Sequence, residues 1–359
     1  MSTVIDKTSE TPRYSQLKAI LKGKIRRGEF RVGDRIPPER ELAELYDVSR
    51  ITVTRAVRDM VLEGLLKREQ GRGTFVSPRP HARSMSIATL VTETREEPSS
   101  YILEMFKGIQ KAISARGYSL VFMNASGDDA PESAPLKMIR EGRLDGLIVV
   151  EHMPKGPLAR LRETGAPIVL LDWEAALPDV DCVLVDDRQA TRLATDHLLG
   201  LGHRTIGFVG GKKSLRFYTE RAAGYREALQ AAGITYRKDL VCWDGPWFAD
   251  GRARIKRMLA RGVTAIAGAS DCLVGGALDV MRNLGVKVPD EMSSVGLGGS
   301  PVRPESFLTT VRIDWVEMGR RAGRSLLARI GGSTAPSEHI RVPGRLLKGR
   351  SCAELDSAP

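Results

Sequence analysis

The feature that most constrains the fold is a regular alternation of short apolar runs with amphipathic segments from residue 86 onward. Buried strands are expected at 87–91, 120–123, 146–150 and 168–171, with helices at 102–116, 136–140 and 158–164. Such alternation predicts a parallel sheet with helices on both of its faces.

The same pattern restarts after Asp186-Asp187. Strands are expected at 205–209, 240–243, 265–269 and 293–297, and helices at 190–201, 221–232, 251–260, 274–284 and 315–329. Two consecutive α/β halves predict two lobes with a ligand cleft between them.

Residues 37–76 do not show this alternation of strands and helices. Pro37-Pro38 can open a short helix at 39–46, because proline fixes φ and its missing N–H is harmless in a first turn. Asp47-Val48 makes a turn, and Ser49 is a suitable N-cap for a second helix. One face of that helix is apolar, formed by Val53, Ala56, Val57, Met60 and Val61. Its other face presents Arg50, Ile51, Thr54, Arg55 and Arg58.

The second helix ends near Gly64, and two short apolar runs follow at 65–66 and 74–76. The segment Gln70-Gly71-Arg72-Gly73 separates them, which predicts a hairpin with a glycine-rich basic tip. A further amphipathic helix, marked by Tyr14, Leu17, Leu21 and Ile25, precedes these elements. Together they predict a winged helix-turn-helix.

The net charge is concentrated in this region. Residues 1–85 hold 18 of the 55 Lys and Arg residues but only 11 of the 44 Asp and Glu residues. A charged helix face is most often a solvated surface. Here, however, the arginines begin in the first turn of the second helix, where recognition helices contact base edges. The pattern therefore predicts binding to double-stranded DNA.

Residues 36–76 also resemble the GntR family of bacterial regulators, with the pattern L-P-S-E-R, V-S-R-x-T-V-R-x-A and Q-G-x-G-T-F-V. The matching segments are 36–40 (IPPER), 48–56 (VSRITVTRA) and 70–76 (QGRGTFV). The resemblance implies that DNA contacts come from Arg40, Ser49, Arg50, Thr52 and Gly71, with Gln70 and Arg72 beside them in the hairpin tip. Thr54 departs from the family, which has an arginine there, and Arg55 lies about 100° further round the helix. Both therefore stay candidates.

Residues 86–350 resemble the LacI/GalR effector domain, itself similar to periplasmic sugar-binding proteins. The matching segments, in family order, are 106–109 (FKGI) with 116–118 (RGY), 145–149 (DGLIV), 167–172 (PIVLLD), 194–204 (ATDHLLGLGHR), 221–225 (RAAGY), 286–290 (VKVPD) and 308–312 (LTTVR). A GntR-type reader joined to a LacI-type sensor resembles the arabinose-repressor-like hybrid regulators.

The LacI/GalR resemblance also implies a set of effector-binding residues. They are Tyr101, Glu151, Asp172, Phe217, Arg221, Trp247, Ser270 and Asp271. Carboxylates and an arginine can bracket sugar hydroxyls, while an aromatic face stacks on a ring. Structural alternatives remain open: a helix cap or ion pair for the aspartates, core packing for Trp247, and a surface position for Arg221. The segment 297–300 (LGGS) lacks an aspartate common in the family, which favours an acidic or modified sugar.

The expected domain organisation follows from these patterns. It comprises a disordered segment 1–12, a winged helix-turn-helix at 13–77, a linker at 78–85 and an effector domain at 86–350. The first lobe is expected at 86–186 plus 312–330, and the second at 187–311 plus 338–350. The resemblance implies a homodimer that pairs along helices including 106–113 and 273–281, with one reader for each DNA half-site.

Other classes of protein find less support. No apolar run approaches the roughly 18 residues of a membrane helix, and the N-terminus lacks a signal-peptide core, so a cytoplasmic protein without membrane attachment is expected. The four cysteines have no metal spacing, His197 and His203 fit structural roles, and no catalytic motif is present. No metal, cofactor or catalytic residue is therefore expected.

Two other classes of protein compete with a regulator. An aminotransferase-like fusion would need a larger domain and a Schiff-base lysine site. A transporter's solute-binding protein would lack the basic N-terminal region. The sequence thus favours a ligand-responsive transcription factor, a repressor of carbohydrate-use genes more than an activator.

Overall fold

The computed structural model describes residues 5–6, 9, 11–26, 28–62, 64–77, 84–91, 100–124, 132–175, 177, 179–243, 251–299 and 307–355. The chain divides into two compact units, Met1–Ser86 with Met138–Asp145, and Ile87–Lys137 with Gly146–Pro359. Of the expected linker at 78–85, only Ser84 and Met85 are among the described residues.

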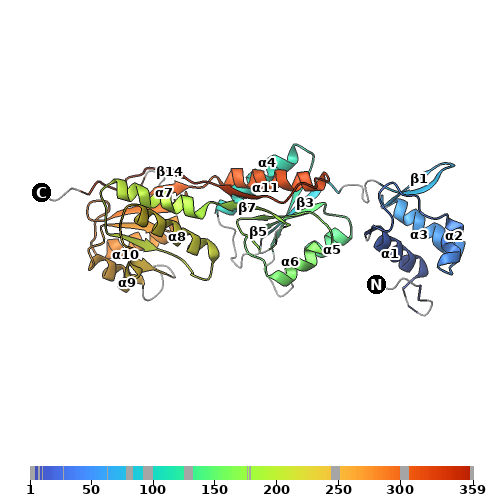
Figure 1. Cartoon of the computed structure of the whole chain (residues 1–359), viewed down its shortest axis with the longest axis horizontal. Coiled ribbons are helices and arrows are strands. Elements are labelled where there is room, and N and C mark those ends of the chain that lie inside the picture. Colours follow the sequence, from blue (N-terminus) through green and yellow to red (C-terminus); the bar gives the residue numbers. More distant parts are fainter. Residues whose placement is uncertain are drawn as a thin grey trace. The chain divides into compact units, whose positions relative to one another are not determined.

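The N-terminal unit is built from helices and one hairpin (Figure 1). Its elements are α1 (Arg13–Arg26), α2 (Glu39–Leu45), α3 (Arg50–Leu62), β1 (Leu66–Glu69) and β2 (Gly73–Val76). The Ser49 hydroxyl accepts a hydrogen bond from the Thr52 N–H at 3.2 Å, so the predicted N-cap of α3 is present. Most of the expected apolar stripe of α3 is buried, with Val61 partly buried, and the arginines and Ile51 of the opposite face are exposed. The predicted winged helix-turn-helix is confirmed.

The hairpin has the register that its sequence predicts. Leu66 pairs with Val76 and Glu69 with Gly73, which leaves Gln70, Gly71 and Arg72 at the tip. Gly71 has a φ of 73° and Gly73 of 120°, in the left-handed region that glycine adopts without steric cost. This explains why the tip is glycine-rich.

Part of the N-terminal segment is ordered, contrary to the expectation for 1–12. Ile5 is buried among the apolar side chains of the N-terminal unit, and the Asp6 N–H donates to Gln16 Oε1 at 2.8 Å. The prediction of disorder is wrong for these two residues, because one apolar side chain and one polar pair fix them beside α1.

The second unit contains two six-stranded sheets, one for each lobe (Figure 1). The first comprises β3 (Ser86–Val91), β4 (Ser119–Asn124), β5 (Gly146–Val150), β6 (Ile168–Leu171), β7 (Asp181–Val185) and β13 (His339–Val342), in the order β13-β7-β6-β5-β3-β4. The second comprises β8 (Ile206–Val209), β9 (Val241–Cys242), β10 (Ala265–Gly268), β11 (Ser293–Gly298), β12 (Thr309–Arg312) and β14 (Arg345–Leu347), in the order β14-β12-β11-β10-β8-β9.

Helices complete both lobes. They are α4 (Ser100–Ser114), α5 (Ser133–Arg140), α6 (Lys155–Arg162) and α11 (Trp315–Ile330) in the first lobe, and α7 (Asp187–Gly200), α8 (Arg216–Ala231), α9 (Gly251–Leu259) and α10 (Asp271–Asn283) in the second. Among the strand pairs whose register is described, β12 with β14 is antiparallel and the others of this unit are parallel. The predicted two-lobed α/β fold is confirmed.

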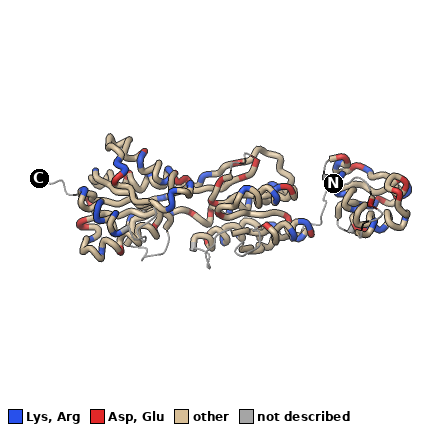
Figure 2. Tube along the Cα trace, turned by 90° about the horizontal axis from the view of Figure 1, so that it is seen from below, with Lys and Arg blue, Asp and Glu red and all other residues tan. Residues whose placement is uncertain are grey.

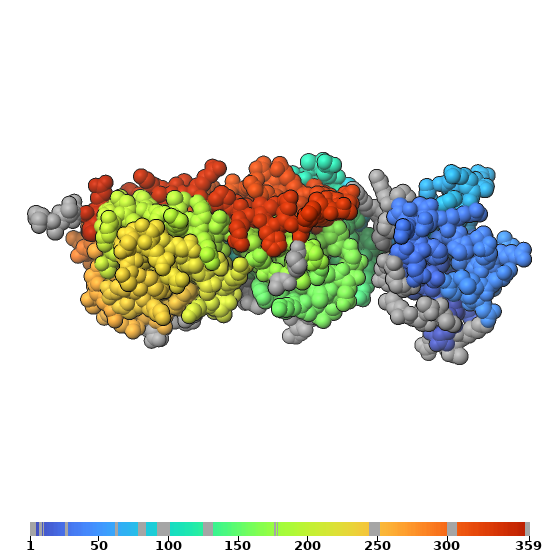
Figure 3. Space-filling model, in the orientation of Figure 1, coloured from blue at the N-terminus to red at the C-terminus, as the bar shows by residue number. Residues whose placement is uncertain are grey.

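The chain returns to the second lobe later than the sequence indicated, after β13 and not before it. The sequence places residues 338–350 in the second lobe, but β13 pairs in parallel with β7 of the first sheet. Only β14 joins the second sheet. The red C-terminal surface accordingly extends over both lobes in Figure 3. Strand β7 itself was missed, because its five residues lie directly before the boundary that the sequence suggested.

Helices α4 and α11 pack at unusually close range beside the first sheet. A Cβ added to Gly108 would lie 2.0 Å from the Val316 carbonyl oxygen, and one added to Gly319 would lie 1.9 Å from that of Met105. Glycine at both positions lets the two backbones approach. The N-terminus of α4, which carries Tyr101, is thereby fixed beside the start of α11.

Candidate functional sites

The exposed face of α3 carries most of the residues predicted to contact DNA. Arg50 and Arg55 are exposed, Thr52 is half-buried, and the Ser49 side chain caps the helix while remaining at the surface. Arg40 of α2 is exposed and forms an ion pair with Glu44 at 3.1 Å. Gln70, Gly71 and Arg72 are exposed at the hairpin tip, where Arg72 lies 2.7 Å from Glu69.

Thr54 and Arg55 differ in how much of their side chain is available. The Thr54 hydroxyl donates to Glu39 Oε2 at 2.6 Å, and Glu39 also pairs with Arg68 of β1. The Arg55 guanidinium stacks on the Tyr14 ring, 3.8 Å from its centroid, and stays exposed. Thr54 is therefore used to hold α2 against α3, whereas Arg55 presents a positive charge held in place by an aromatic ring.

Basic and acidic positions are interspersed along both units (Figure 2). Basic residues of the N-terminal unit lie on α1, α3 and the hairpin, and Glu39, Glu44 and Glu69 pair with Arg68, Arg40 and Arg72. Such pairing fixes the position of the cations more than it neutralises the surface, because most of these ion pairs are well exposed to water.

In the first lobe, two of the predicted cleft residues follow neighbouring parallel strands. Glu151 comes after β5 and Asp172 after β6, and both have a φ of 64°. Residues other than glycine seldom adopt this left-handed conformation, and strain of this kind gathers at functional sites. The Tyr101 hydroxyl donates to Glu151 Oε1, and the Tyr101 ring packs on Trp315 with centroids 5.0 Å apart.

In the second lobe, Arg221 is the centre of a polar cluster. Its guanidinium donates from Nε to Asp187 Oδ1 at 2.7 Å and from Nη1 to the Ala269 carbonyl at 2.7 Å. It also lies 5.1 Å from the centroid of the Phe217 ring. The residue is only 7% exposed, so the surface position considered from the sequence is excluded.

The acids around Arg221 have displaced pKa values. Burial raises the pKa of Asp172 to about 8, with Asp187 and Glu151 adding to the effect and Arg221 opposing it. Burial also raises the pKa of Asp187, against the attraction of Arg221. At neutral pH Asp172 therefore holds its proton and can both donate and accept hydrogen bonds, which suits a ligand rich in hydroxyl groups.

Ser270 and Asp271 have structural partners within the second lobe. The Ser270 hydroxyl caps α10 by accepting from the Leu273 N–H at 3.2 Å. Asp271 is buried and accepts from the Thr310 hydroxyl at 2.6 Å. A Cβ on Gly296 would lie 2.1 Å from the Asp271 carboxylate, so the glycine at this position makes room for it. The role of both residues in effector binding stays a prediction, and Trp247 lies outside the described residues.

Sequence reasoning missed several polar residues of this region. The sequence pattern marks Asp187 only as the start of the second lobe, although an acid in the first turn of a helix is a recognisable signal. Glu174, which follows β6, forms an ion pair with Arg216 at the start of α8 and lies 3.0 Å from His339 Nδ1. The ion pair between Glu174 and Arg216 joins the two lobes, and no local sequence pattern predicts it.

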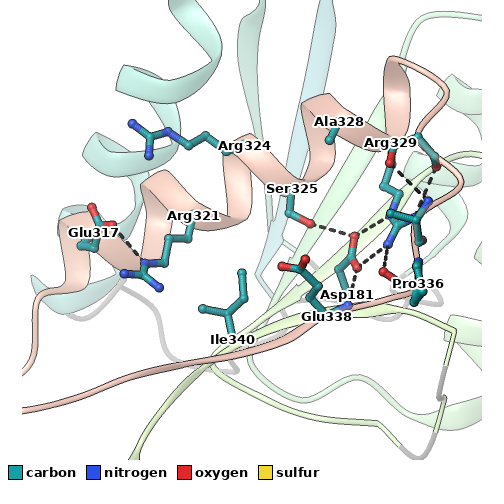
Figure 4. Close-up of a pocket in the computed structure, with 12 residues that line it drawn as sticks. Asp181, Glu317, Arg321, Arg324, Ser325, Ala328, Arg329, Pro336, Glu338 and Ile340 are labelled. Carbon is teal, nitrogen blue, oxygen red and sulfur yellow. Dashed lines mark hydrogen bonds and ion pairs between the residues drawn. The ribbon is translucent and has the colours of Figure 1, made fainter.

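A separate cavity of about 420 Å³ lies at the edge of the first lobe, between α11, β7 and β13 (Figure 4). Asp181 accepts hydrogen bonds there from the Arg329 guanidinium at 2.7 Å, the Ser325 hydroxyl at 2.7 Å and the Glu338 N–H at 2.9 Å. These partners satisfy the buried carboxylate, so its role is to fix the turn between α11 and β13.

The described part of the chain offers neither a metal site nor a membrane-spanning helix. No group of three or more His, Cys, Asp or Glu side chains there could hold a metal ion. No helix among the described residues is long and apolar enough to cross a membrane.

Comparison with known proteins gives two family matches. Residues 13–76 match the bacterial regulatory proteins of the gntR family, and residues 195–352 match the periplasmic binding protein-like domain. The arabinose metabolism transcriptional repressor of Geobacillus stearothermophilus is 30% identical over 344 residues, which is 90% of this chain and 93% of that protein. The transcriptional regulator MalR of Streptomyces coelicolor is 31% identical over 77% of this chain and 83% of its own length.

Solved structures agree with these matches. A complex of the transcriptional regulator CelR with cellobiose has 25% sequence identity and a TM-score of 0.66, and the likeness covers 94% of this chain and 98% of that one. A LacI family transcriptional regulator from Mycobacterium smegmatis has 27% identity and a TM-score of 0.62, over 75% of this chain and 99% of that one.

Proposed function

Because this chain belongs to the bacterial transcriptional regulators that join a gntR-family DNA-binding domain to a periplasmic binding protein-like domain, we propose that it represses carbohydrate-use genes in the cytoplasm. A sugar or sugar derivative bound between the lobes would release it from its operator. The family consists of transcription regulators, not enzymes. The printed names of two similar proteins, an arabinose metabolism repressor and a regulator in complex with cellobiose, support a carbohydrate effector.

For DNA binding, we assign base contacts to the first turns of α3 and backbone contacts to the hairpin tip. Ser49, Arg50 and Thr52 lie where recognition helices meet base edges. Arg55, stacked on Tyr14, supplies charge beside them in preference to Thr54, whose hydroxyl is committed to Glu39. Arg40 and the tip residues 70–72 would contact phosphates.

The observation that carries the effector assignment is the acidic cluster around Arg221. Asp172 of the first lobe and Asp187 of the second both act on this guanidinium, so a ligand placed here would touch both lobes. The Arg221 guanidinium already donates to Asp187 and to the Ala269 carbonyl. Asp187 supplies a counter-charge, and fewer N–H groups of Arg221 are available to a carboxylate ligand. This favours a neutral sugar over the acidic sugar that the glycines at 298 and 299 suggested.

Release from DNA requires that the ligand change the arrangement of the lobes. A ligand shifts such an equilibrium only if it contacts one arrangement better than the other. The ion pair between Glu174 and Arg216 spans the lobes in the present arrangement, and a change in the arrangement would break it.

The proposed homodimer would pair along the outer face of α4. Leu103 is exposed there, and the Phe106 ring lies against the exposed Phe122 of β4 with centroids 5.3 Å apart. In α10, by contrast, Leu273 and Met281 are buried within the lobe, so pairing along that helix would rely on its outward residues, such as Cys272 and Asp279.

Two arginines provide the test of DNA readout. After selection of an operator from random DNA with the full chain, Arg50→Ala should weaken the selected site by roughly 1–3 kcal/mol while random DNA is little affected. Arg72→Ala should weaken both kinds of DNA alike and reduce the salt slope by about 1. An unchanged ratio of specific to random affinity for Arg50→Ala would show that α3 does not read bases.

The effector is tested separately by tryptophan fluorescence. Titration with arabinose, cellobiose, glucose and glucuronate should give saturable binding for a neutral sugar, and that sugar should release the selected DNA. Saturable binding and DNA release by glucuronate alone would contradict the preference for a neutral ligand.

A further inference from the structure

The side chain of Ile51 stands out on the surface of the N-terminal unit. It is 82% exposed, the highest value among the large exposed hydrophobic side chains of the described residues. It lies in the first turn of α3, two residues after the Ser49 cap. Its neighbours on the same helix face are four and seven positions further on, Arg55 and Arg58, both exposed.

The position of Ile51 on α3 rules out a role in the core. The buried face of the helix is formed by Val53, Val57 and Met60, and Ile51 points away from it. An isoleucine costs free energy when it stays in water, since roughly 0.8 kcal/mol is lost for each apolar CH₂ left exposed. An apolar partner that covered Ile51 would recover this free energy, and the place of Ile51 among the candidate base-contacting residues suits such a partner.

The charges around Ile51 restrict the kind of partner. Arg50, Arg55 and Arg58 surround it, and an apolar protein surface would leave these guanidinium groups without water or counter-charge. The major groove of DNA offers what this combination needs, with phosphates at its edges and an apolar group on its floor. That apolar group is the 5-methyl of thymine.

We infer that Ile51 packs on the 5-methyl group of a thymine in each half-site and so helps to select the operator sequence. The inference rests on the proposed DNA-binding function and names one chemical group that the readout requires. Arg50 would fix the helix on a neighbouring base, and Ile51 would reject cytosine, or any base without a methyl group, at its own position.

Replacement of thymine by uracil tests this contact, because it removes the methyl group and keeps every hydrogen-bonding atom of the base. An operator is first selected from random DNA with the full chain, and each thymine is then replaced in turn. At one thymine of a half-site, uracil should weaken binding by about fourfold, and by roughly fifteenfold when both half-sites are changed. Ile51→Ala should bind thymine and uracil versions with equal affinity.

Leu45→Ala is the matched control. Leu45 is also a large exposed apolar residue, at the end of α2, so its variant should keep the wild-type ratio between the thymine and uracil operators. Both substitutions are at the surface, and thermal melting should show both proteins folded.

The outcomes separate this inference from the proposed function. If the wild-type chain enriches no DNA sequence, the DNA-binding function itself fails. If it enriches an operator but Ile51→Ala still prefers thymine over uracil, or the wild type ignores the methyl group everywhere, Ile51 contacts something else and the inference is overturned. A change in oligomeric state of Ile51→Ala without an altered thymine preference would point to a second copy as the partner, and would also overturn it.

Discussion

Asp172→Asn should remove a large part of the pH dependence of stability in the effector unit. Asp172 follows β6 with a left-handed φ, and burial raises its pKa to about 8, helped by Asp187 and Glu151 and opposed by Arg221. Asparagine has nearly the same shape, tolerates this backbone conformation and carries no charge. The substitution therefore changes the titration and little else.

The sign and size of the effect follow from the two pKa values. The ordinary value for this carboxyl is 3.8, so between that pH and about 8 the folded protein binds a proton that the unfolded chain has released. The proton on Asp172 therefore adds its full contribution to the free energy of unfolding at low pH. That contribution falls by about 1.4 kcal/mol for each pH unit across this window. Between pH 5.5 and 7.5 the wild type should therefore lose roughly 2–3 kcal/mol of stability through Asp172, and Asp172→Asn should not show this loss.

Tryptophan fluorescence during urea unfolding measures this difference. All four tryptophans, Trp173, Trp243, Trp247 and Trp315, belong to the second unit, so the N-terminal unit does not contribute to the signal. His197 and His203 have pKa values lowered by burial and act with the opposite sign near the same pH. Because they are present in both proteins, they cancel when the variant is compared with the wild type.

Glu317→Gln serves as the control for this experiment. Burial alone would raise the pKa of Glu317, but hydrogen bonds from Arg320 and Arg321 outweigh it and the pKa is lowered. The group is ionised in both the folded and unfolded states above pH 5.5, so its removal should leave the slope unchanged. If Asp172→Asn kept the full wild-type slope, Asp172 would be ionised in the folded protein, and the account of the cluster around Arg221 would be wrong.

Two further predictions concern packing and charge. Arg221→Met should destabilise the second unit by about 3–5 kcal/mol in urea unfolding, because it leaves buried acids without their cation, and adding Asp187→Asn should recover part of the loss; a single variant as stable as the wild type would contradict the buried ion pair. Gly108→Ala should destabilise by about 1–3 kcal/mol or more in the same assay, since its Cβ would lie 2.0 Å from the Val316 carbonyl. Gly200→Ala, with nothing within 4 Å of the added Cβ, should be neutral or stabilising by about 0.4–1 kcal/mol, and equal effects at the two glycines would refute the close packing of α4 with α11.

Local sequence patterns were sufficient for most of the secondary structure. The buried stripe of α3, its Ser49 cap and the glycine-rich tip of the hairpin were all predicted, because periodicity, capping and left-handed turns depend on residues only a few positions apart. The alternation of strands and helices likewise predicted two α/β lobes. These properties depend on residues that are close together in the sequence, so they do not require the elements to pack against one another.

The partners of charged and terminal residues were decided by the tertiary structure. No local pattern pairs Arg221 with Asp187, joins Glu174 to Arg216, or assigns the Thr54 hydroxyl to Glu39. The same holds for β13, whose place in the first sheet depends on where α11 ends in space. The strength of these interactions depends on distance and burial, and both are fixed only when elements far apart in the sequence pack together.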